Sequence, residues 1–436
     1  MINPATEEYY RNYYGAYLSK YIQRKNAQDT RFNYILAFIV ICILLATIAL
    51  AQPLFAKAQT DETIAYSPPP SNSIILDKKT FEEGIRQKYK TNNIIFPTQG
   101  IAHIKKIKYI NSKPVKINIV EINTNVNPYL KIKPQIAGEK LNSKSTVRKI
   151  AKKNNAIIAI NAGFFKPQTG VPLGALMIDR KVLTGPIYNR VGIAIFENDH
   201  KTSYKMANIE FEINALTKNN KVKIDNINQP RMLQSYMLLY TSDWGKIVPQ
   251  APKTGWNLVI RDNKTVKITA NAVEIQNGDM VLQGNKEILS KLAKDSEIRI
   301  DIKVQDELQD AKHIISAGPY LVKDSQIYVD TQIQRLQAIS GKNPRSAIGY
   351  KHDGTLIIVT VDGREETSVG MTLRELAVLM KNLGCENAMN FDGGSSSAIY
   401  VNGKIANHAV NKEGIAVSNA LTVYEANPEE MQLAGI

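Results

Sequence analysis

Polar side chains follow three apolar stretches of the chain, at the points where the stretches end. Asn161 comes directly after Ala156–Ile160, a continuous apolar run that is typical of a strand buried on both faces. Asp362 follows a second apolar run, and Asp392 follows Asn387–Phe391. If these strands share one sheet and one direction, their ends converge on a single cleft, where such sheets bind ligands.

Arginines accompany the two carboxylates. Arg364 lies two residues after Asp362, and Arg345 begins another predicted strand. A guanidinium binds phosphate oxygens through paired hydrogen bonds, and two carboxyl groups can divide acid and base work between them. We therefore predict Asp392, Asp362 and Arg345 as catalytic residues of a site for an anionic substrate. Each residue also has a simpler interpretation: a surface ion pair for Arg345, an Asp-Gly turn for Asp362 and a cap for Asn161.

Two glycines and three serines follow Asp392. Gly393 and Gly394 permit backbone angles that other residues avoid and allow a ligand to approach the main chain. The hydroxyl and backbone N–H groups of Ser395–Ser397 can bind anionic oxygens. A plain turn is the alternative interpretation of such a run.

The sequence offers little for a metal or a serine nucleophile. Its five histidines are dispersed without ligand spacing, and the serines after Asp392 do not form a Gly-x-Ser-x-Gly motif. We predict no cofactor and no metal site, although a divalent cation between Asp392 and Asp362 stays open. Of the two cysteines, Cys42 lies in an apolar segment far from Cys385, so no disulfide is expected.

The elements that position these residues are clearest near the C-terminus. Residues 345–361 predict a two-stranded hairpin, and Thr372–Gly384 predicts a helix with a capping box and a terminal glycine. With the strand that follows, they form the parts of a crossover unit. Residues 77–89 and 146–154 predict two shorter helices, and residues 192–315 read as a β-rich layer. The fold class expected is mixed α/β (α+β): a central β-sheet with flanking helices and a β-rich middle layer, preceded by one transmembrane helix.

Residues 32–56 are uncharged and almost wholly apolar, which is long enough for one membrane-spanning helix. Basic residues just before this segment predict a single-pass protein of the cell membrane with a cytoplasmic N-terminus. A signal peptide cleaved near Ala56-Lys57-Ala58 is the alternative. The expected organisation is a cytoplasmic segment (1–31), a membrane anchor (32–56), an extracytoplasmic linker (57–99), a globular domain (100–425) and a tail (426–436).

The formal net charge is +15. Such an excess suits anionic lipid or a phosphate-bearing polymer, and a solvated basic surface is the alternative. Nucleic acid is not expected as a partner, because the lysines are scattered through strand-like stretches and are not clustered with aromatic residues.

Several motifs, taken in order, resemble the phosphodiester glycosidase family over residues 100–425. They are Asn161-Ala162-Gly163-Phe164-Phe165, Ala317-Gly318-Pro319, Pro344–Gly349, Asp362-Gly363-Arg364, the Thr372–Gly384 helix, Asn390–Ser397 and Val401-Asn402-Gly403. The chain departs from the family pattern at Ser395, where a third glycine is usual, and at Asn411–Gly414, where the family often has an arginine.

The resemblance implies an extracytoplasmic enzyme that hydrolyses the bond between a sugar's anomeric carbon and a phosphodiester oxygen. It implies a site lined by the catalytic residues already named and by substrate-binding residues: Asn161, Gly163, Arg364, Asn390, Gly393, Gly394 and Ser396. The substrate expected is a phosphate-bearing polysaccharide, glycolipid or glycoprotein. Two alternatives stay open: a catalytically silent polysaccharide-binding module of envelope assembly, and a transferase that passes the glycosyl group to a polymer.

Overall fold

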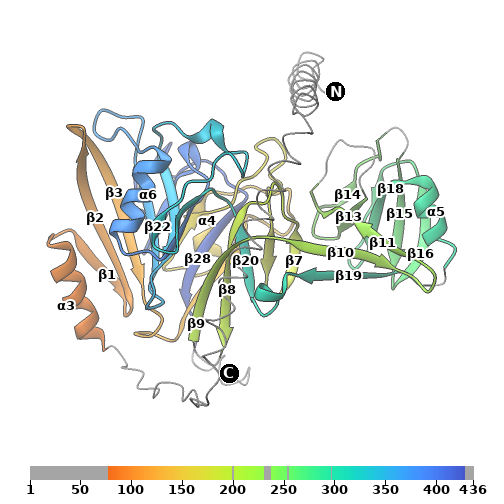
Figure 1. The fold of residues 1–436 in the computed structure, drawn as a ribbon, viewed down its shortest axis with the longest axis horizontal. Helices are drawn as coiled ribbons and strands as arrows, with labels where there is room; N and C mark the ends of the chain where they lie inside the picture. Colours follow the sequence, from red (N-terminus) through yellow and green to blue (C-terminus); the bar gives the residue numbers. More distant parts are fainter. Residues whose placement is uncertain (1–76, 199–200, 230–236, 253–254, 296, 428–436) are drawn as a thin grey trace, which may run out of the picture. The chain divides into compact units, whose positions relative to one another are not determined.

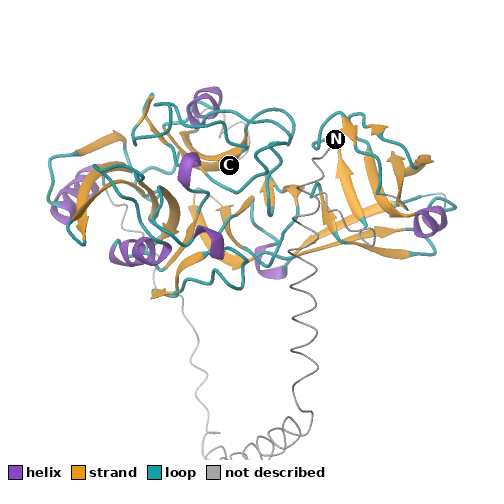
Figure 2. Ribbon diagram, turned by 90° about the horizontal axis from the view of Figure 1, so that it is seen from above, coloured by secondary structure: helices purple, strands orange, loops and turns teal. Residues whose placement is uncertain are grey.

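The computed structural model describes residues 77–198, 201–229, 237–252, 255–295 and 297–427. These residues form 28 strands in six sheets and four α-helices, and the strands predominate throughout (Figure 2). The predicted segments 1–31 and 32–56 lie outside the described residues, as do residues 57–76 of the predicted linker. No helix of the described residues is long and apolar enough to cross a membrane.

The largest sheet has eight strands and carries most of the predicted motifs. Its order is β1 (Ile94–Thr98), β2 (Ile101–Ile110), β3 (Lys113–Ile122), β24 (Leu356–Val361), β23 (Arg345–Tyr350), β25 (Asn387–Asn390), β21 (Tyr320–Lys323) and β22 (Gln326–Ile327). The predicted hairpin is confirmed as β23–β24, which pair antiparallel from Arg345–Val361 to Tyr350–Leu356. Gly354, with a φ of 83°, makes the turn between them.

Helix α6 (Leu373–Asn382) connects β24 to β25. The predicted capping box is confirmed, since Thr372 accepts the N–H of Glu375 and the Glu375 carboxylate accepts the N–H of Thr372. The two strands lie on opposite sides of β23 and are antiparallel to it, so the crossover passes over one strand. α6 packs with α3 (Lys78–Tyr89) in the core on one face of the eight-stranded sheet (Figure 1).

The other face of this sheet packs against two further sheets. One has the order β27 (Lys404–Ile405), β26 (Ile399–Val401), β5 (Ile158–Asn161), β28 (Asn419–Glu425), β4 (Leu130–Ile136). The second has the order β7 (Lys181–Thr184), β6 (Leu176–Ile178), β20 (His313–Ser316), β8 (Val191–Asn198), β9 (Lys201–Asn208). Buried side chains of all three sheets, among them Ile160, Ile193 and Ile358, form one core.

The β-rich middle of the chain builds three smaller sheets around two cores of their own. They are β11 (Lys221–Ile224), β10 (Phe211–Leu216), β19 (Arg299–Val304); β12 (Asn226–Ile227), β13 (Leu238–Thr241), β18 (Met280–Asn285), β15 (Gly255–Arg261), β16 (Lys264–Thr269); and β14 (Ile247–Val248), β17 (Val273–Glu274). Helix α5 (Lys286–Leu292) contacts β15 and β18, and α4 (Val147–Lys153) contacts β5. In Figure 1, β10 and β19 form a long pair that leads to this region.

The expected fold class, a mixed α/β fold built on a central sheet with flanking helices, is wrong. The described residues are mainly β, and the main core lies between sheets rather than between a sheet and helices. Of the strand pairs in this part of the chain, β12–β13 alone is parallel. The reason is that most consecutive strands are joined by short turns, which place them side by side in opposite directions. Helices α3 and α6 cover one face of the eight-stranded sheet, and its other face packs against further sheets.

Candidate functional site

Two of the predicted strand exits meet, although the strands belong to different sheets. Asp392 follows β25 of the eight-stranded sheet, and Asn161 ends β5 of a five-stranded sheet. The Asp392 N–H donates to the carbonyl of Ala162 at 2.8 Å, and Asn161 Nδ2 donates to the carbonyl of Asp392 at 2.6 Å. The convergence therefore arises where two packed sheets touch, not along the edge of one parallel sheet.

Asn161 is fully engaged in this junction. Its Oδ1 accepts a hydrogen bond from Ser346 Oγ at 2.7 Å and from the N–H of Ala398 at 3.1 Å. The residue is only 1% exposed. Asn161 thus holds the Asp392 backbone in place, and its predicted contact with substrate stays a prediction.

Asp392 is half-buried, and its environment changes its acidity. Burial raises the pKa of the carboxyl group to about 6. Hydrogen bonds from Ser396 and from the N–H of Gly393 act in the opposite direction, but the effect of burial is larger. The Gly393 bond measures 3.0 Å to Oδ1. A carboxyl group with this pKa holds and releases a proton close to neutral pH, which is the property required of a general acid or base.

Close packing favours glycine at position 393, and backbone conformation favours it at position 394. A Cβ on Gly393 would lie 3.0 Å from the carbonyl oxygen of Pro344, and one on Gly394 would lie 3.0 Å from Arg364 Nη2. Gly394 also has a φ of 62°, in the left-handed region that favours glycine. The turn η3 (Gly394–Ser396) follows and presents its serines beside Arg364.

Arg364 is exposed and bonds to uncharged groups. Its Nη1 donates to Ser395 Oγ at 3.1 Å, and its Nε and Nη2 donate to Asn343 Oδ1 at 3.2 and 2.9 Å. Because no carboxylate of the described residues forms an ion pair with it, the guanidinium is available to an anion. Asn343 was missed by the sequence reasoning, although it directly precedes the predicted motif at Pro344.

Arg345 lies in the protein interior. The sequence had suggested either a surface ion pair or a position facing the substrate. Its side chain is among the largest that are fully buried. Nε donates to the carbonyl of Met371 at 2.8 Å, and Nη2 donates to the carbonyls of Ile339, at 2.8 Å, and Gly341. Burial, together with the charge of Arg364, lowers the pKa of Arg345 to about 10. These bonds anchor the segment 339–371 around the site, and the catalytic role of Arg345 stays a prediction.

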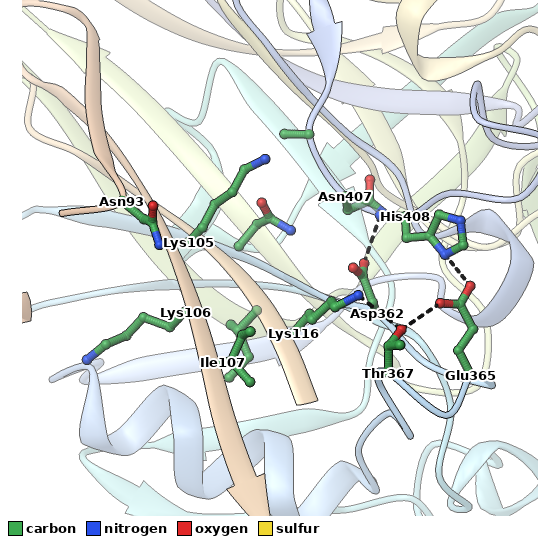
Figure 3. A pocket seen from close by; sticks show the side chains of 13 residues that line it. Asn93, Lys105, Lys106, Ile107, Lys116, Asp362, Glu365, Thr367, Asn407 and His408 are labelled. Carbon is green, nitrogen blue, oxygen red and sulfur yellow. Dashed lines mark hydrogen bonds and ion pairs between the residues drawn. The ribbon is translucent and has the colours of Figure 1, made fainter. Parts of the chain in front are cut away.

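Asp362 lines a cavity of about 580 Å³ between its own loop and the β2–β3 hairpin (Figure 3). The N–H of His408 donates to Asp362 Oδ1 at 3.1 Å, and the residue is 4% exposed. Burial raises the pKa of Asp362, opposed by the bonds from His408 and the Asn407 side chain. Asp392 is not among the residues that line this cavity.

Basic and acidic side chains face each other across the same cavity. Lys105, Lys106 and Lys116 come from β2 and β3, and His408 is paired with Glu365 on the opposite wall (Figure 3). Neither the lysines nor His408 was predicted as a site residue from the sequence. The available signal was the run of lysines in β2, whose residues 105–109 are all exposed.

The two remaining predicted positions lie beneath the site surface. Asn390 is fully buried; its Nδ2 donates to the carbonyl of Gly318 at 3.0 Å, and its Oδ1 has no partner among the described residues. The Gly163 N–H donates to Asn419 Oδ1 at 2.7 Å, and a Cβ there would lie 3.0 Å from the carbonyl oxygen of Ser316. Asn419 is thus a further residue that shapes the site and was not predicted.

Among the described residues, no group of three or more His, Cys, Asp and Glu side chains is placed to hold a metal ion. The cation considered between Asp392 and Asp362 therefore has no ligand cluster in this part of the chain.

Comparison with known proteins connects this geometry to a family. Residues 254–424 match the family model described as phosphodiester glycosidase. An uncharacterized protein derived from the SPbeta prophage of Bacillus subtilis is 36% identical over 151 residues, which cover 35% of this chain and 21% of that protein. The N-acetylglucosamine-1-phosphodiester alpha-N-acetylglucosaminidase of Mus musculus is 26% identical over 117 residues, covering 24% of this chain and 22% of the mouse protein.

A solved structure shares the fold. It is a hypothetical protein from Synechocystis, with a TM-score of 0.67 and 23% sequence identity over 74% of this chain and 62% of that one. The chain spans about a fifth of the length of the curated relatives named above. The family resemblance read from the sequence is thus confirmed: this chain carries, in residues 254–424, a match to the phosphodiester glycosidase family.

Proposed function

We propose that this protein is a hydrolase that cleaves the bond between the anomeric carbon of a sugar and a phosphodiester oxygen. The observation that carries the proposal is Asp392: a half-buried carboxyl with a pKa of about 6, beside a Gly-Gly-Ser turn that Arg364 contacts. The match of residues 254–424 to a phosphodiester glycosidase family supports it.

The chemistry follows from the two charges. The group that leaves the sugar is a phosphate monoester, which is a stable anion and needs little help from a proton donor. A guanidinium such as that of Arg364 stabilises the negative charge that develops on this group. Asp392 is then left to act on the other side of the sugar, as a base that activates water or as a nucleophile.

In the base version, the bond from the anomeric carbon to the phosphate oxygen breaks, and the phosphate keeps the electron pair. The oxygen of a water molecule forms the new bond to carbon, and its proton passes to Asp392. At pH 7 this carboxyl is mostly ionised and ready to accept a proton, because its pKa of about 6 lies just below. Asp362, with a pKa that burial also raises, is the second carboxyl group available for proton transfer.

The substrate class and the location complete the proposal. A formal net charge of +15 suits a phosphate-bearing polysaccharide, glycolipid or glycoprotein outside the cytoplasm. Residues 32–56 would anchor the protein in the membrane with its N-terminus inside. Protease added to intact cells is then expected to digest the globular part and to leave a short N-terminal fragment; full protection would refute this orientation.

The activity is tested with the full-length protein and a panel of sugar-1-phosphodiesters. N-acetylglucosamine is the first sugar to try, because the mouse relative is named for it. Release of free sugar by the parent, with loss in Asp392→Asn, is the expected result. Retention of a phosphate-bearing polymer without sugar release would favour a binding module, and transfer of the sugar to an added acceptor would favour a transferase.

A further inference from the structure

Arg190 is a buried arginine that forms no ion pair with a carboxylate of the described residues. It lies in the turn between β7 and β8, directly after Tyr188 and Asn189, which have φ values of 52° and 50°. The residue is 7% exposed, and its Nε and Nη1 atoms have no hydrogen-bond acceptor among the described residues. Burial without a neighbouring carboxylate lowers the pKa of Arg190 to about 10, so the group is still charged at neutral pH.

Aromatic rings surround this guanidinium, and a second arginine joins it. The centre of the Arg190 guanidinium lies 5.0 Å from the centroid of the Phe164 ring and 5.5 Å from that of Tyr188. Arg335 lies 4.9 Å from the Tyr188 centroid. Within the described residues, neither arginine forms an ion pair with a carboxylate. Two positive charges therefore share one aromatic ring with no compensating negative charge.

The contrast with Arg345 shows that burial alone does not explain this arrangement. Arg345 is equally buried, but its guanidinium donates to three backbone carbonyls. Arg190 has ring faces around it, and these supply only part of what a guanidinium loses when it leaves water. A buried cation left in this state costs stability, which indicates a ligand that supplies the missing acceptors.

Arg190 is connected to the site from two directions. Phe164 lies two residues after Ala162, whose carbonyl accepts the N–H of Asp392. On the other side, the N–H of Val191 donates to Gln334 Oε1 at 3.2 Å, and the loop that holds Gln334 and Arg335 continues to Asn343, the partner of Arg364. The segments packed around Arg190 therefore continue along the chain into the β5 side and the β24 side of the site.

We propose that Arg190, assisted by Arg335, forms an oxyanion-binding subsite that takes the phosphate of the substrate's phosphodiester. The inference rests on the proposed function for the identity of the substrate, but the binding of an oxyanion is independent of it. The exposed ring of Tyr188 is the cover that moves aside when the anion enters. The charge-assisted bonds to Nε and Nη1 then replace the ring contact.

The test compares two variants of the full-length protein, Arg190→Met and Arg190→Lys, with a matched control, Arg261→Lys. Arg261 forms an ion pair with Asp279 in the middle region and is outside the proposed subsite. Melting temperatures are measured with increasing inorganic phosphate and, at equal ionic strength, with chloride. Phosphate is expected to raise the melting temperatures of the parent and the control, because a ligand that binds only the folded state stabilises it.

Arg190→Met is expected to abolish the phosphate response without lowering the melting temperature of the ligand-free protein, because it removes an unpaired buried charge. Arg190→Lys is expected to weaken phosphate binding roughly tenfold to a hundredfold, the scale of a lost bond to a charged group. A variant that melts at lower temperature yet keeps the phosphate response would make Arg190 a structural residue and overturn the inference.

Activity separates this inference from the proposed function. If sugar-1-phosphodiesters are hydrolysed, phosphate must inhibit competitively, and Arg190→Lys must raise the KM for the phosphodiester but not for a neutral aryl glycoside of the same sugar. Non-competitive inhibition would assign the phosphate to a separate effector site and refute the substrate subsite. If no phosphodiester is hydrolysed but the phosphate response depends on Arg190, the proposed function fails while the oxyanion site stands.

Discussion

Replacing Asp392 by asparagine tests the site and the fold together. The pKa of the carboxyl group is about 6 in the folded protein, against an ordinary value of 3.8. Raising the pKa from 3.8 to about 6 corresponds to about 3 kcal/mol. Because the folded state binds the proton more tightly, stability falls as the pH rises from about 4 to 6, and the full cost persists above pH 6.

Asparagine cannot ionise, so Asp392→Asn removes this cost. Its Oδ1 can still accept the N–H of Gly393, and its amide can donate to Ser396. We therefore expect the variant to gain up to about 3 kcal/mol of unfolding free energy at pH 8 and almost nothing at pH 4. Sugar release should fall by roughly a hundredfold or more, because the amide can neither accept a proton nor attack carbon.

The measurement is chemical denaturation of parent and variant at both pH values, beside a pH–rate profile. Asp279→Asn is the matched control, because the bonds from Arg261 hold the pKa of Asp279 below its ordinary value. That variant should lose stability at pH 8 and lose less at pH 4, the opposite trend. An equal effect of Asp392→Asn at the two pH values, or undiminished sugar release, would refute the assignment of a raised pKa and a catalytic role.

Three further predictions concern the frame of the site. Arg345→Lys should lower the unfolding free energy by about 2–4 kcal/mol, since one ammonium nitrogen cannot replace the two guanidinium nitrogens that reach three separate carbonyls. An unchanged denaturation midpoint with lost turnover would instead support direct phosphate binding. Asn161→Leu should cost a similar amount and reduce sugar release, because it breaks the bonds that join β5 to Asp392, and a variant of parental stability would refute this positioning role. Asp362→Asn should gain stability at pH 8 relative to pH 4, because burial raises the pKa of Asp362. The same variant should reduce sugar release at least about tenfold. Glu365→Gln, in the same cavity, should have neither effect.

Local signals in the sequence predicted local structure well. The capping box at Thr372, the hairpin of β23 and β24, and the helices near residues 78 and 147 all form where the pattern of residues indicates them. Hydrogen bonds within a turn or a hairpin involve neighbours in the chain, so the necessary residue types stand close together in the sequence. The polar residues at the ends of apolar runs were visible for the same reason.

The direction and pairing of the strands were not predictable in this way. An apolar run such as that of β5 is buried on both faces in a parallel sheet. The same run is also buried on both faces when its antiparallel sheet is covered on both sides. Periodicity therefore could not tell which of the two would form. For this reason the predicted central sheet with flanking helices was wrong. Asn161 and Asp392 still lie together, because the two sheets that carry them are in contact.

The sequence alone determined which residues stand at the strand ends, where the glycines lie, and that the motifs resemble the phosphodiester glycosidases. The tertiary structure alone decided that Arg345 donates to backbone carbonyls, that Arg364 donates to Asn343, and that Arg190 is buried with no ion pair among the described residues. It also decided the pKa of Asp392, because desolvation depends on every group that packs around a carboxyl. Residue type and spacing are properties of the chain, whereas burial and partnership depend on contacts between segments far apart in it.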